Sequence, residues 1–161
     1  MRNRIYIPIT ANNHLVGWQG RIVGEAAKAP KYYNSPGMKK SRMLYNLDSA
    51  KTQPFLVVVE GIPSVWRIGL SAVCLFGKSL SNWQRLTIAT EFSSKPVFLV
   101  LDNDAQEQTE SIYASLSAIG VKVIPVFLPD SRDPADYSRE ELFDLLQSTA
   151  DAIGAEVDLK I

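Results

Sequence analysis

Residues 55–61 read Phe-Leu-Val-Val-Val-Glu-Gly, and residues 97–104 read Val-Phe-Leu-Val-Leu-Asp-Asn-Asp. Both apolar runs are too short for helices and are rich in β-branched and aromatic residues, which predicts two buried strands. Each run ends directly in acidic residues. In open parallel sheets, binding sites form beyond the carboxyl ends of the strands. If the two strands are neighbours, their carboxylates therefore converge at one edge of the sheet.

The carboxylates at these strand ends belong to Glu60, Asp102 and Asp104. Carboxylates gathered at one point repel one another and shift one another's pKa. A hard divalent cation prefers oxygen ligands and relieves that repulsion. The pattern predicts a Mg²⁺ or Mn²⁺ site. The simpler alternative is that acids at strand ends cap the helices that follow.

Short strands alternate with helices over most of the chain. The pattern predicts strands over 55–59, 72–76, 97–101 and 121–127, and helices over 63–70, 80–91, 105–119 and 138–152. Such alternation indicates an α/β fold, a Rossmann-like and mostly parallel sheet with helices on both faces. Residues 5–23 predict a β-hairpin, and residues 24–41 an extended, exposed loop. We expect a basic hairpin-and-loop segment over 1–50, a main domain over 51–153 and a tail over 154–161.

The charge of the chain is unevenly distributed. Residues 1–50 carry eight Lys/Arg and two Asp/Glu, a net charge of +6 that the remainder balances with −6. A basic segment beside an acidic site suits the binding of polyanions, although a solvated basic face without a ligand is the alternative. Tyr32 and Tyr33, between lysines, are candidates for stacking on bases. The candidate nucleotide- and nucleic-acid-binding residues are Arg21, Lys31, Tyr33, Asn34, Lys39, Lys40 and Arg42.

Cysteine content and hydropathy limit the class of protein. The chain has one cysteine, Cys74, which excludes a disulfide framework and a cysteine-based zinc site and fits a reducing cytoplasm. We find no signal peptide, and no apolar run approaches the ~20 residues that span a bilayer. We therefore expect a cytoplasmic protein with no membrane partner.

Two glycines are predicted to form turns. Gly61 follows Glu60 directly and lets the backbone turn there. Gly77 lies in Gly77-Lys78-Ser79, which is not a phosphate loop because position 72, five residues before Gly77, is alanine. We expect Gly77 to form a tight turn and Ser79 or Ser81 to cap the next helix. Trp66 and Trp83 lie in predicted amphipathic helices, which favours core packing for both.

Several motifs together resemble a known family. Glu60-Gly61 at one strand end and Asp102-x-Asp104 at a later one resemble the Toprim signature. Further segments resemble the DnaG-type primases of bacteria and phages. These segments are Gly-Arg-Ile-Val (20–23), Pro-Lys-Tyr-Tyr-Asn-Ser-Pro (30–36), Lys-Lys-Ser-Arg (39–42), Leu-Phe-Gly-Lys-Ser-Leu-Ser (75–81), Leu-Pro-Asp (128–130) and Asp-Pro-Ala-Asp-Tyr (133–137). The resemblance covers about residues 5–145.

This resemblance implies the catalytic core of a DNA primase, which makes short RNA primers on single-stranded DNA from ribonucleoside triphosphates in phage or bacterial replication. It implies that Asp102 and Asp104 bind Mg²⁺ or Mn²⁺ and that Asp130 is a weaker further ligand. Two roles are open for Glu60, metal ligand or general base.

The departures from the family pattern suggest a partner. The cysteines of the zinc module and the flanking polymerase subdomains of primases are missing here, so we expect a separate zinc-binding or helicase protein.

Two other functions fit the same residues. One is a stand-alone Toprim nuclease that directs water at a phosphodiester. The other is a non-catalytic Toprim module that binds nucleic acid or the replisome.

Overall fold

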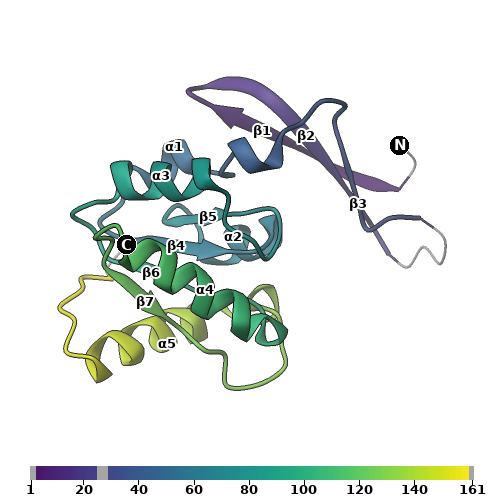
Figure 1. Cartoon of the computed structure of the whole chain (residues 1–161). Helices are drawn as coiled ribbons and strands as arrows, with labels where there is room; N and C mark the ends of the chain where they lie inside the picture. The colour runs from purple at the N-terminus through teal and green to yellow at the C-terminus, as the bar shows by residue number, and fades with distance from the viewer. Residues whose placement is uncertain (1–2, 25–28, 160–161) are drawn as a thin grey trace.

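The computed structural model describes residues 3–24 and 29–159. The chain forms two separate sheets (Figure 1). The first is antiparallel, with the order β1-β2-β3, and consists of β1 (Arg4–Ala11), β2 (His14–Ile22) and β3 (Tyr32–Asn34). The predicted hairpin is confirmed as β1 and β2, whose register places Pro8 opposite Trp18.

The predicted exposed loop over 24–41 is wrong in part. It contains β3, which pairs with β2 through Gly20 and Tyr33, and the first residues of the 3₁₀ helix η1 (Lys40–Arg42). Residues 25–28 of the predicted loop lie outside the described residues. A strand of three residues is too short to show a period of two, so its sequence has no detectable strand signal.

The second sheet is parallel and follows the prediction closely. Its four strands have the order β5-β4-β6-β7 and comprise β4 (Leu56–Val59), β5 (Ala72–Cys74), β6 (Val97–Leu99) and β7 (Val123–Pro125). β4 pairs with β5 on one side and with β6 on the other. The predicted neighbourhood of the two acidic strand ends is therefore confirmed.

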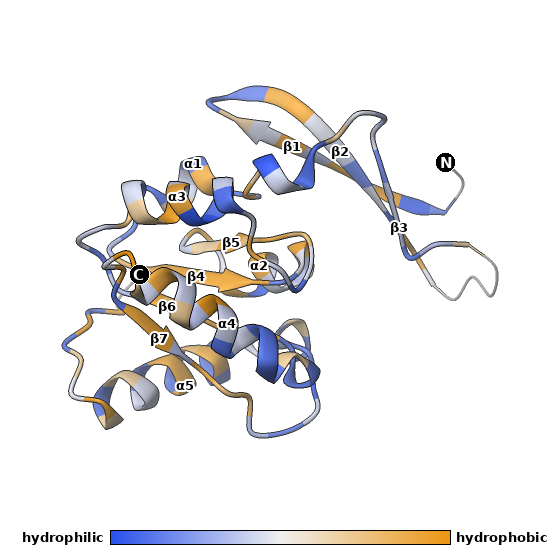
Figure 2. Cartoon of the chain, in the orientation of Figure 1, coloured by the Kyte–Doolittle hydropathy of each residue, from blue (hydrophilic) through white to orange (hydrophobic). Residues whose placement is uncertain are grey.

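Helices cover both faces of this sheet, as predicted (Figure 1). Val57 and Val59 face α2 (Ile62–Ile68) and α5 (Arg139–Ala152) in one buried cluster. Leu56 and Val58 point to the other cluster, which contains α1 (Leu47–Ala50), α3 (Asn82–Glu91) and α4 (Gln106–Ser117). Figure 2 shows the apolar strands enclosed between helices whose outer faces are more polar. Burial on both faces explains why the strands are continuous apolar runs.

Local caps fix where the helices begin. Ser81 accepts a hydrogen bond from the Gln84 backbone N–H, and the Gln84 side chain accepts one from the Ser81 N–H, a capping box that confirms Ser81 as an N-cap. Ser138 and Glu141 form the same motif at the start of α5. Two short 3₁₀ helices, η2 (Asn103–Ala105) and η3 (Pro134–Asp136), follow the acidic residues Asp102 and Asp133.

The expectation that Trp66 and Trp83 pack in the core is wrong. Their side chains are 48% and 41% exposed. In α2 the buried face is formed by Ile62, Val65 and Ile68, and Trp66 instead donates a hydrogen bond of 3.0 Å from Nε1 to the Tyr45 hydroxyl. In α3 the polar residue Gln84 is buried in the core, in place of its neighbour Trp83, for which the amphipathic pattern predicted that position.

None of the helices within residues 3–24 and 29–159 is long and apolar enough to cross a membrane.

The predicted division at residue 50 stays a prediction. Across that point the segments are in contact, because Tyr45 forms an isolated bridge with Cys74 beside β5.

Candidate metal centre and its basic pocket

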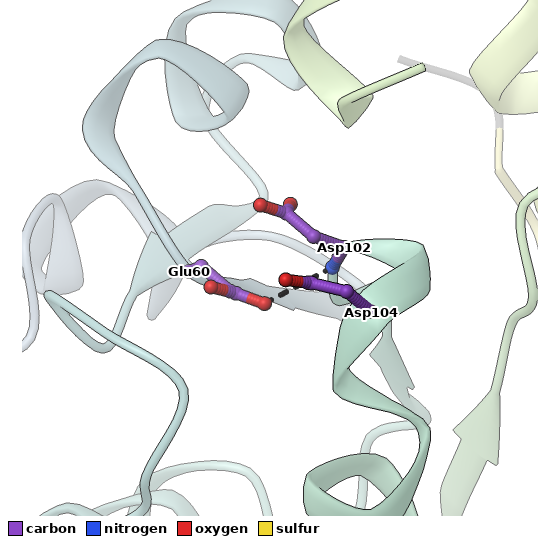
Figure 3. A group of neighbouring side chains, drawn as sticks. All are labelled: Glu60, Asp102 and Asp104. Carbon is purple, nitrogen blue, oxygen red and sulfur yellow. Dashed lines mark hydrogen bonds between the residues drawn. The ribbon is translucent and has the colours of Figure 1, made fainter. Parts of the chain in front are cut away.

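The three predicted carboxylates converge at the carboxyl edge of the parallel sheet (Figure 3). Glu60 directly follows β4, Asp102 follows β6 and caps η2, and Asp104 lies within η2. One carboxylate oxygen from each residue lies within 4.8 Å of the other two. The order of β4 and β6 in the sheet produces this arrangement, because adjacent parallel strands end at the same edge.

The electrostatics of the cluster suit a cation. Burial raises the pKa of Glu60, and the neighbouring Asp102 carboxylate raises it further. Burial also raises the pKa of Asp102, with smaller contributions from Asp133 and Asp104. A raised pKa means that the ionised form is disfavoured here. Three mutually repelling oxygen donors, of which those of Glu60 and Asp102 are partly desolvated, form the ligand set that Mg²⁺ or Mn²⁺ prefers, so the residues fit such an ion.

A lysine beside this cluster was not identified as a site residue from the sequence. The Lys78 ammonium forms an ion pair with the Asp104 carboxylate, and this hydrogen bond raises the pKa of Lys78. Lys78 belongs to the loop after β5, which lies directly beside β4. The sequence signal was available, because Lys78 follows a strand end as the three acids do, but the motif was judged only as a failed phosphate loop.

A pocket of about 330 Å³ joins the acidic edge to the first sheet. Glu60 and Asp102 line it on one side, and the predicted basic residues Arg21, Lys31 and Lys40 line it on the other. Arg21 comes from β2, Lys31 directly precedes β3, and Lys40 begins η1. The fold thus brings cations from the first forty residues against carboxylates that follow much later in the chain.

The two tyrosines of β3 face opposite sides of the first sheet. Tyr32 lines the pocket, with the Arg21 guanidinium 5.8 Å from its ring centre, and burial raises the pKa of its hydroxyl. Tyr33 is 50% exposed, and its ring lies under the Arg4 guanidinium at 4.5 Å. Alternation along a strand explains the difference. Of the two stacking candidates, Tyr32 lies at the site.

The remaining polar candidates from this region lie around the pocket. Asn34 accepts a hydrogen bond of 2.9 Å through Oδ1 from the Gln19 side chain, and Gln19 itself lines the pocket. Lys39 directly precedes η1 and Arg42 is its last residue, and neither is among the residues that line the pocket. Their predicted contacts with phosphates stay predictions.

Helix α3 holds η1 in place. The buried Gln84 donates from Nε2 to the carbonyls of Lys40 at 3.3 Å, Met43 at 2.9 Å and Leu75 at 3.2 Å. The Ser81 hydroxyl donates to the Ser41 carbonyl at 2.6 Å. Because these bonds attach η1 to the start of α3, they determine the position of the Lys40 backbone. No sequence pattern indicates this role for Gln84.

Asp130 is held by other residues of its own turn. Its carboxylate forms an ion pair of 3.0 Å with Arg132 and accepts a hydrogen bond of 2.6 Å from the Tyr137 hydroxyl. Arg132 keeps the pKa of Asp130 well below its usual range. Within the described residues, the group able to hold a metal consists of Glu60, Asp102 and Asp104 and does not include Asp130. The predicted weaker ligand role of Asp130 stays a prediction.

Two other acids of the same turn line the pocket, Asp133 and Asp136. The Asn103 side-chain amide donates to the Asp130 carbonyl, so the turn is attached to the loop between Asp102 and Asp104. The acidic turn therefore contributes to the site through Asp133 and Asp136 and through this backbone attachment.

The two predicted turn glycines differ. Gly77 has φ of 153°, a conformation that L side chains rarely adopt, and its N–H donates to the Glu60 carbonyl at 3.1 Å. Gly61 has φ of −128°, and a Cβ there would meet Pro63 Cδ at 3.6 Å, an ordinary contact. The backbone turn behind Glu60 therefore does not depend on glycine, whereas the turn that carries Lys78 does.

Comparisons with known proteins show which class of protein shares this parallel sheet with its acidic edge and the antiparallel sheet beside it. The family described as DNA primase catalytic core, N-terminal domain, matches residues 1–51. The DNA primase of Aquifex aeolicus is 31% identical over 166 residues, covering 92% of this chain and 33% of that protein. The DNA primase of Staphylococcus aureus strain COL is 32% identical over 150 residues, 84% of this chain and 24% of that protein.

Solved structures agree with the sequence relatives. The zinc-binding and RNA polymerase domains of Aquifex aeolicus primase match with a TM-score of 0.77 and 30% identity over 91% of this chain and 40% of that one. A DnaG primase catalytic domain bound to single-stranded DNA matches with a TM-score of 0.74 and 26% identity, covering 93% of this chain and 51% of that one. Over most of its length the chain is similar to DNA primases, and the solved structures that it matches include a DnaG primase catalytic domain. It spans about a third or less of the length of the curated relatives described above.

Proposed function

We propose that this chain is the metal-dependent catalytic core of a bacterial or phage DNA primase, which joins ribonucleotides on a single-stranded DNA template. One observation carries the proposal. A single pocket combines carboxylates at strand ends with Arg21, Lys31 and Lys40, in a fold shared with DnaG catalytic cores. Joining nucleotides requires both a centre that stabilises developing negative charge and groups that bind phosphates.

The proposed metal ligands are Glu60, Asp102 and Asp104, and the proposed ion is Mg²⁺ or Mn²⁺. When bound, such an ion stabilises the negative charge that develops on phosphate oxygens during nucleotidyl transfer. The protein's contribution is orientation. The Asp102 N–H fixes the Glu60 carboxylate by a hydrogen bond of 3.1 Å, and β4 and β6 fix the two backbones relative to one another.

The basic side of the pocket would bind the substrates. Arg21, Lys31 and Lys40 suit the oxygens of a ribonucleoside triphosphate and of the template backbone, because charge-assisted hydrogen bonds to phosphate are strong. The Tyr32 ring, beside Arg21 in the same pocket, offers a surface for stacking of a base. A related DnaG catalytic domain bound to single-stranded DNA supports the choice of ligand.

We further propose that a second protein completes the template channel. The total charge of the chain is zero, which provides little general attraction for DNA. A zinc-binding or helicase protein from the same replication system is the proposed partner. Much of the rate of a polymerase comes from holding template, nucleotides and metal together.

The test is a primer-synthesis assay. The purified chain, with and without the candidate partner, is incubated with single-stranded DNA, labelled ribonucleotides and Mn²⁺. We expect oligoribonucleotides that depend on the partner and disappear in Asp102→Asn, while the exposed variant Asp144→Asn behaves as the wild type. Cleavage of the template in place of synthesis would identify a nuclease. Binding without either reaction would identify a non-catalytic module.

A further inference from the structure

Lys78 places a positive charge directly against the acidic cluster. Its ammonium forms an ion pair with Asp104, and Glu60 and Asp102 are close enough to act on it electrostatically. The loop that carries Lys78 follows β5, and the strand order β5-β4-β6 sets this loop beside the other two strand ends. Three adjacent strand ends therefore carry one cation and three anions.

The Lys78 ammonium and a divalent cation compete for the same carboxylate. Asp104 contributes an oxygen to the group that lies within 4.8 Å, and the same side chain is paired with Lys78. Two cations close to one carboxylate repel each other, and in a partly desolvated site this repulsion is stronger than in water. Binding of a divalent ion therefore favours movement of the ammonium away from Asp104.

The surroundings of Lys78 leave room for such a movement. Its side chain is 39% exposed. It also lines a second groove of about 360 Å³, together with Ser79 and Gln108, and Glu60 is not among the residues that line this groove. A lysine has a flexible four-carbon stem, so its ammonium moves without displacement of the backbone. The neighbouring Gly77 lines the basic pocket, so a phosphate held there lies close to the loop that carries Lys78.

We propose that Lys78 is a phosphate-binding residue that stays paired with Asp104 until a divalent cation binds. In the metal-free site its ammonium neutralises the Asp104 carboxylate. Once the cation binds, the Lys78 side chain moves and its ammonium pairs with the triphosphate of the nucleotide. This inference rests on the proposed metal site. It assigns a substrate contact to a residue outside the basic segment. It also gives a role to a lysine that lies beside carboxylates proposed to bind a metal.

The first measurement is a Mn²⁺ titration by calorimetry at low ionic strength. Lys78→Gln removes the competing charge, so we expect it to bind Mn²⁺ roughly three- to tenfold more tightly than the wild type. The matched control is Lys122→Gln, an exposed lysine that precedes β7 at the opposite edge of the sheet. It removes the same charge from the protein and should leave the Mn²⁺ affinity unchanged.

The second measurement is ATP binding at saturating Mn²⁺. We expect Lys78→Gln to bind ATP roughly tenfold more weakly, because a charge-assisted contact with phosphate is lost. Tighter metal binding together with weaker nucleotide binding is a pattern that general damage to the fold does not produce. Lys78→Arg keeps the charge and should keep both affinities near those of the wild type.

The outcomes separate this inference from the proposed function. A wild-type protein without affinity for Mn²⁺ would contradict the metal site, and the role of Lys78 with it. A wild type that binds Mn²⁺, beside a Lys78→Gln variant with equal or weaker affinity, would overturn the role of Lys78 and leave the metal site standing. Unchanged ATP binding by Lys78→Gln would overturn the proposed transfer to phosphate.

Discussion

The backbone N–H of Asp102 donates a hydrogen bond of 3.1 Å to Oε1 of Glu60, which attaches the residue after β6 to the residue after β4 (Figure 3). The bond orients one carboxylate while its second oxygen stays available. It also links the acidic cluster to the parallel sheet, since Glu60 directly follows β4 and Asp102 follows β6 after the buried residues Val100 and Leu101. The site is therefore built on rigid elements, which favours defined ligand geometry.

Asp104→Asn should weaken Mn²⁺ binding by about tenfold or more, because it replaces one of three converging anionic oxygens with a neutral amide. Asp104 is exposed, so the fold should persist. Calorimetric titration of the folded variant measures the effect. Asp144→Asn, at an exposed position of α5, is the control and should titrate as the wild type. An unchanged affinity in Asp104→Asn would remove this residue from the ligand set.

Much of the main sheet could be predicted because its strands are apolar on both faces and its helices have clear caps. Val57 and Val58 point to opposite clusters, and both are buried, so the run could only be a central strand. The convergence of Glu60, Asp102 and Asp104 followed from the rule that sites form at the carboxyl edge. Their roles as ligands remain to be tested.

Other parts of the site depend on tertiary pairing that has no local signature. The strand β3 is recognisable only through its bonds to β2, and those bonds decide that Tyr32, not Tyr33, faces the pocket. Gln84 is another example, because a buried glutamine looks like a surface residue until its carbonyl partners are known. Lys78 follows a strand end, so its place at this edge has a sequence signal, but its ion pair with Asp104 has none, since the pair joins two loops that are far apart in sequence.

Lys40 and Lys39 should differ in their contribution to nucleic-acid binding, because Lys40 lines the pocket and Lys39 does not. Lys40→Ala should weaken binding of single-stranded DNA and lower the slope of log affinity against log salt by roughly 0.7, the value for one phosphate neutralised. Lys39→Ala should change the slope less. Fluorescence anisotropy with a labelled oligonucleotide over a range of salt measures both. Equal slopes in the two variants would contradict the assignment from the pocket.

Asp130 should stabilise the fold in a pH-dependent way. Arg132 and Tyr137 lower the pKa of Asp130 in the folded state, so its contribution is fully present above the usual pKa of 3.8. It is lost as the pH falls below that value, when the carboxylate becomes protonated. The difference in unfolding free energy between wild type and Asp130→Asn should therefore be larger at pH 6 than near pH 3. Urea unfolding at both values tests this, and a constant difference would contradict it.

Gln84→Ala should be among the more destabilising polar substitutions in the chain. Its side-chain amide donates to the carbonyls of Lys40, Met43 and Leu75, and its side chain is 1% exposed. Removal leaves the buried Leu75 carbonyl and the partly buried Met43 carbonyl without this donor, while the Lys40 carbonyl still accepts from the Met43 N–H. We estimate the cost at about 3 kcal/mol of unfolding free energy. The matched control is Gln147→Ala in α5, whose amide donates to Asp151 on an exposed helix face at 2.8 Å. It should cost less than about 1 kcal/mol.

The same substitution should also affect the site, because one of the three carbonyls belongs to Lys40. Without Gln84, η1 loses part of its attachment to α3, and the backbone that positions Lys40 at the pocket is held less firmly. We expect Gln84→Ala, at a temperature where it is fully folded, to bind single-stranded DNA with a salt slope close to that of Lys40→Ala. Its Mn²⁺ affinity should match the wild type, since Glu60, Asp102 and Asp104 have no hydrogen bond to Gln84 among those found in the described residues. A variant that loses metal and DNA binding together would show instead that α3 supports the whole edge of the sheet.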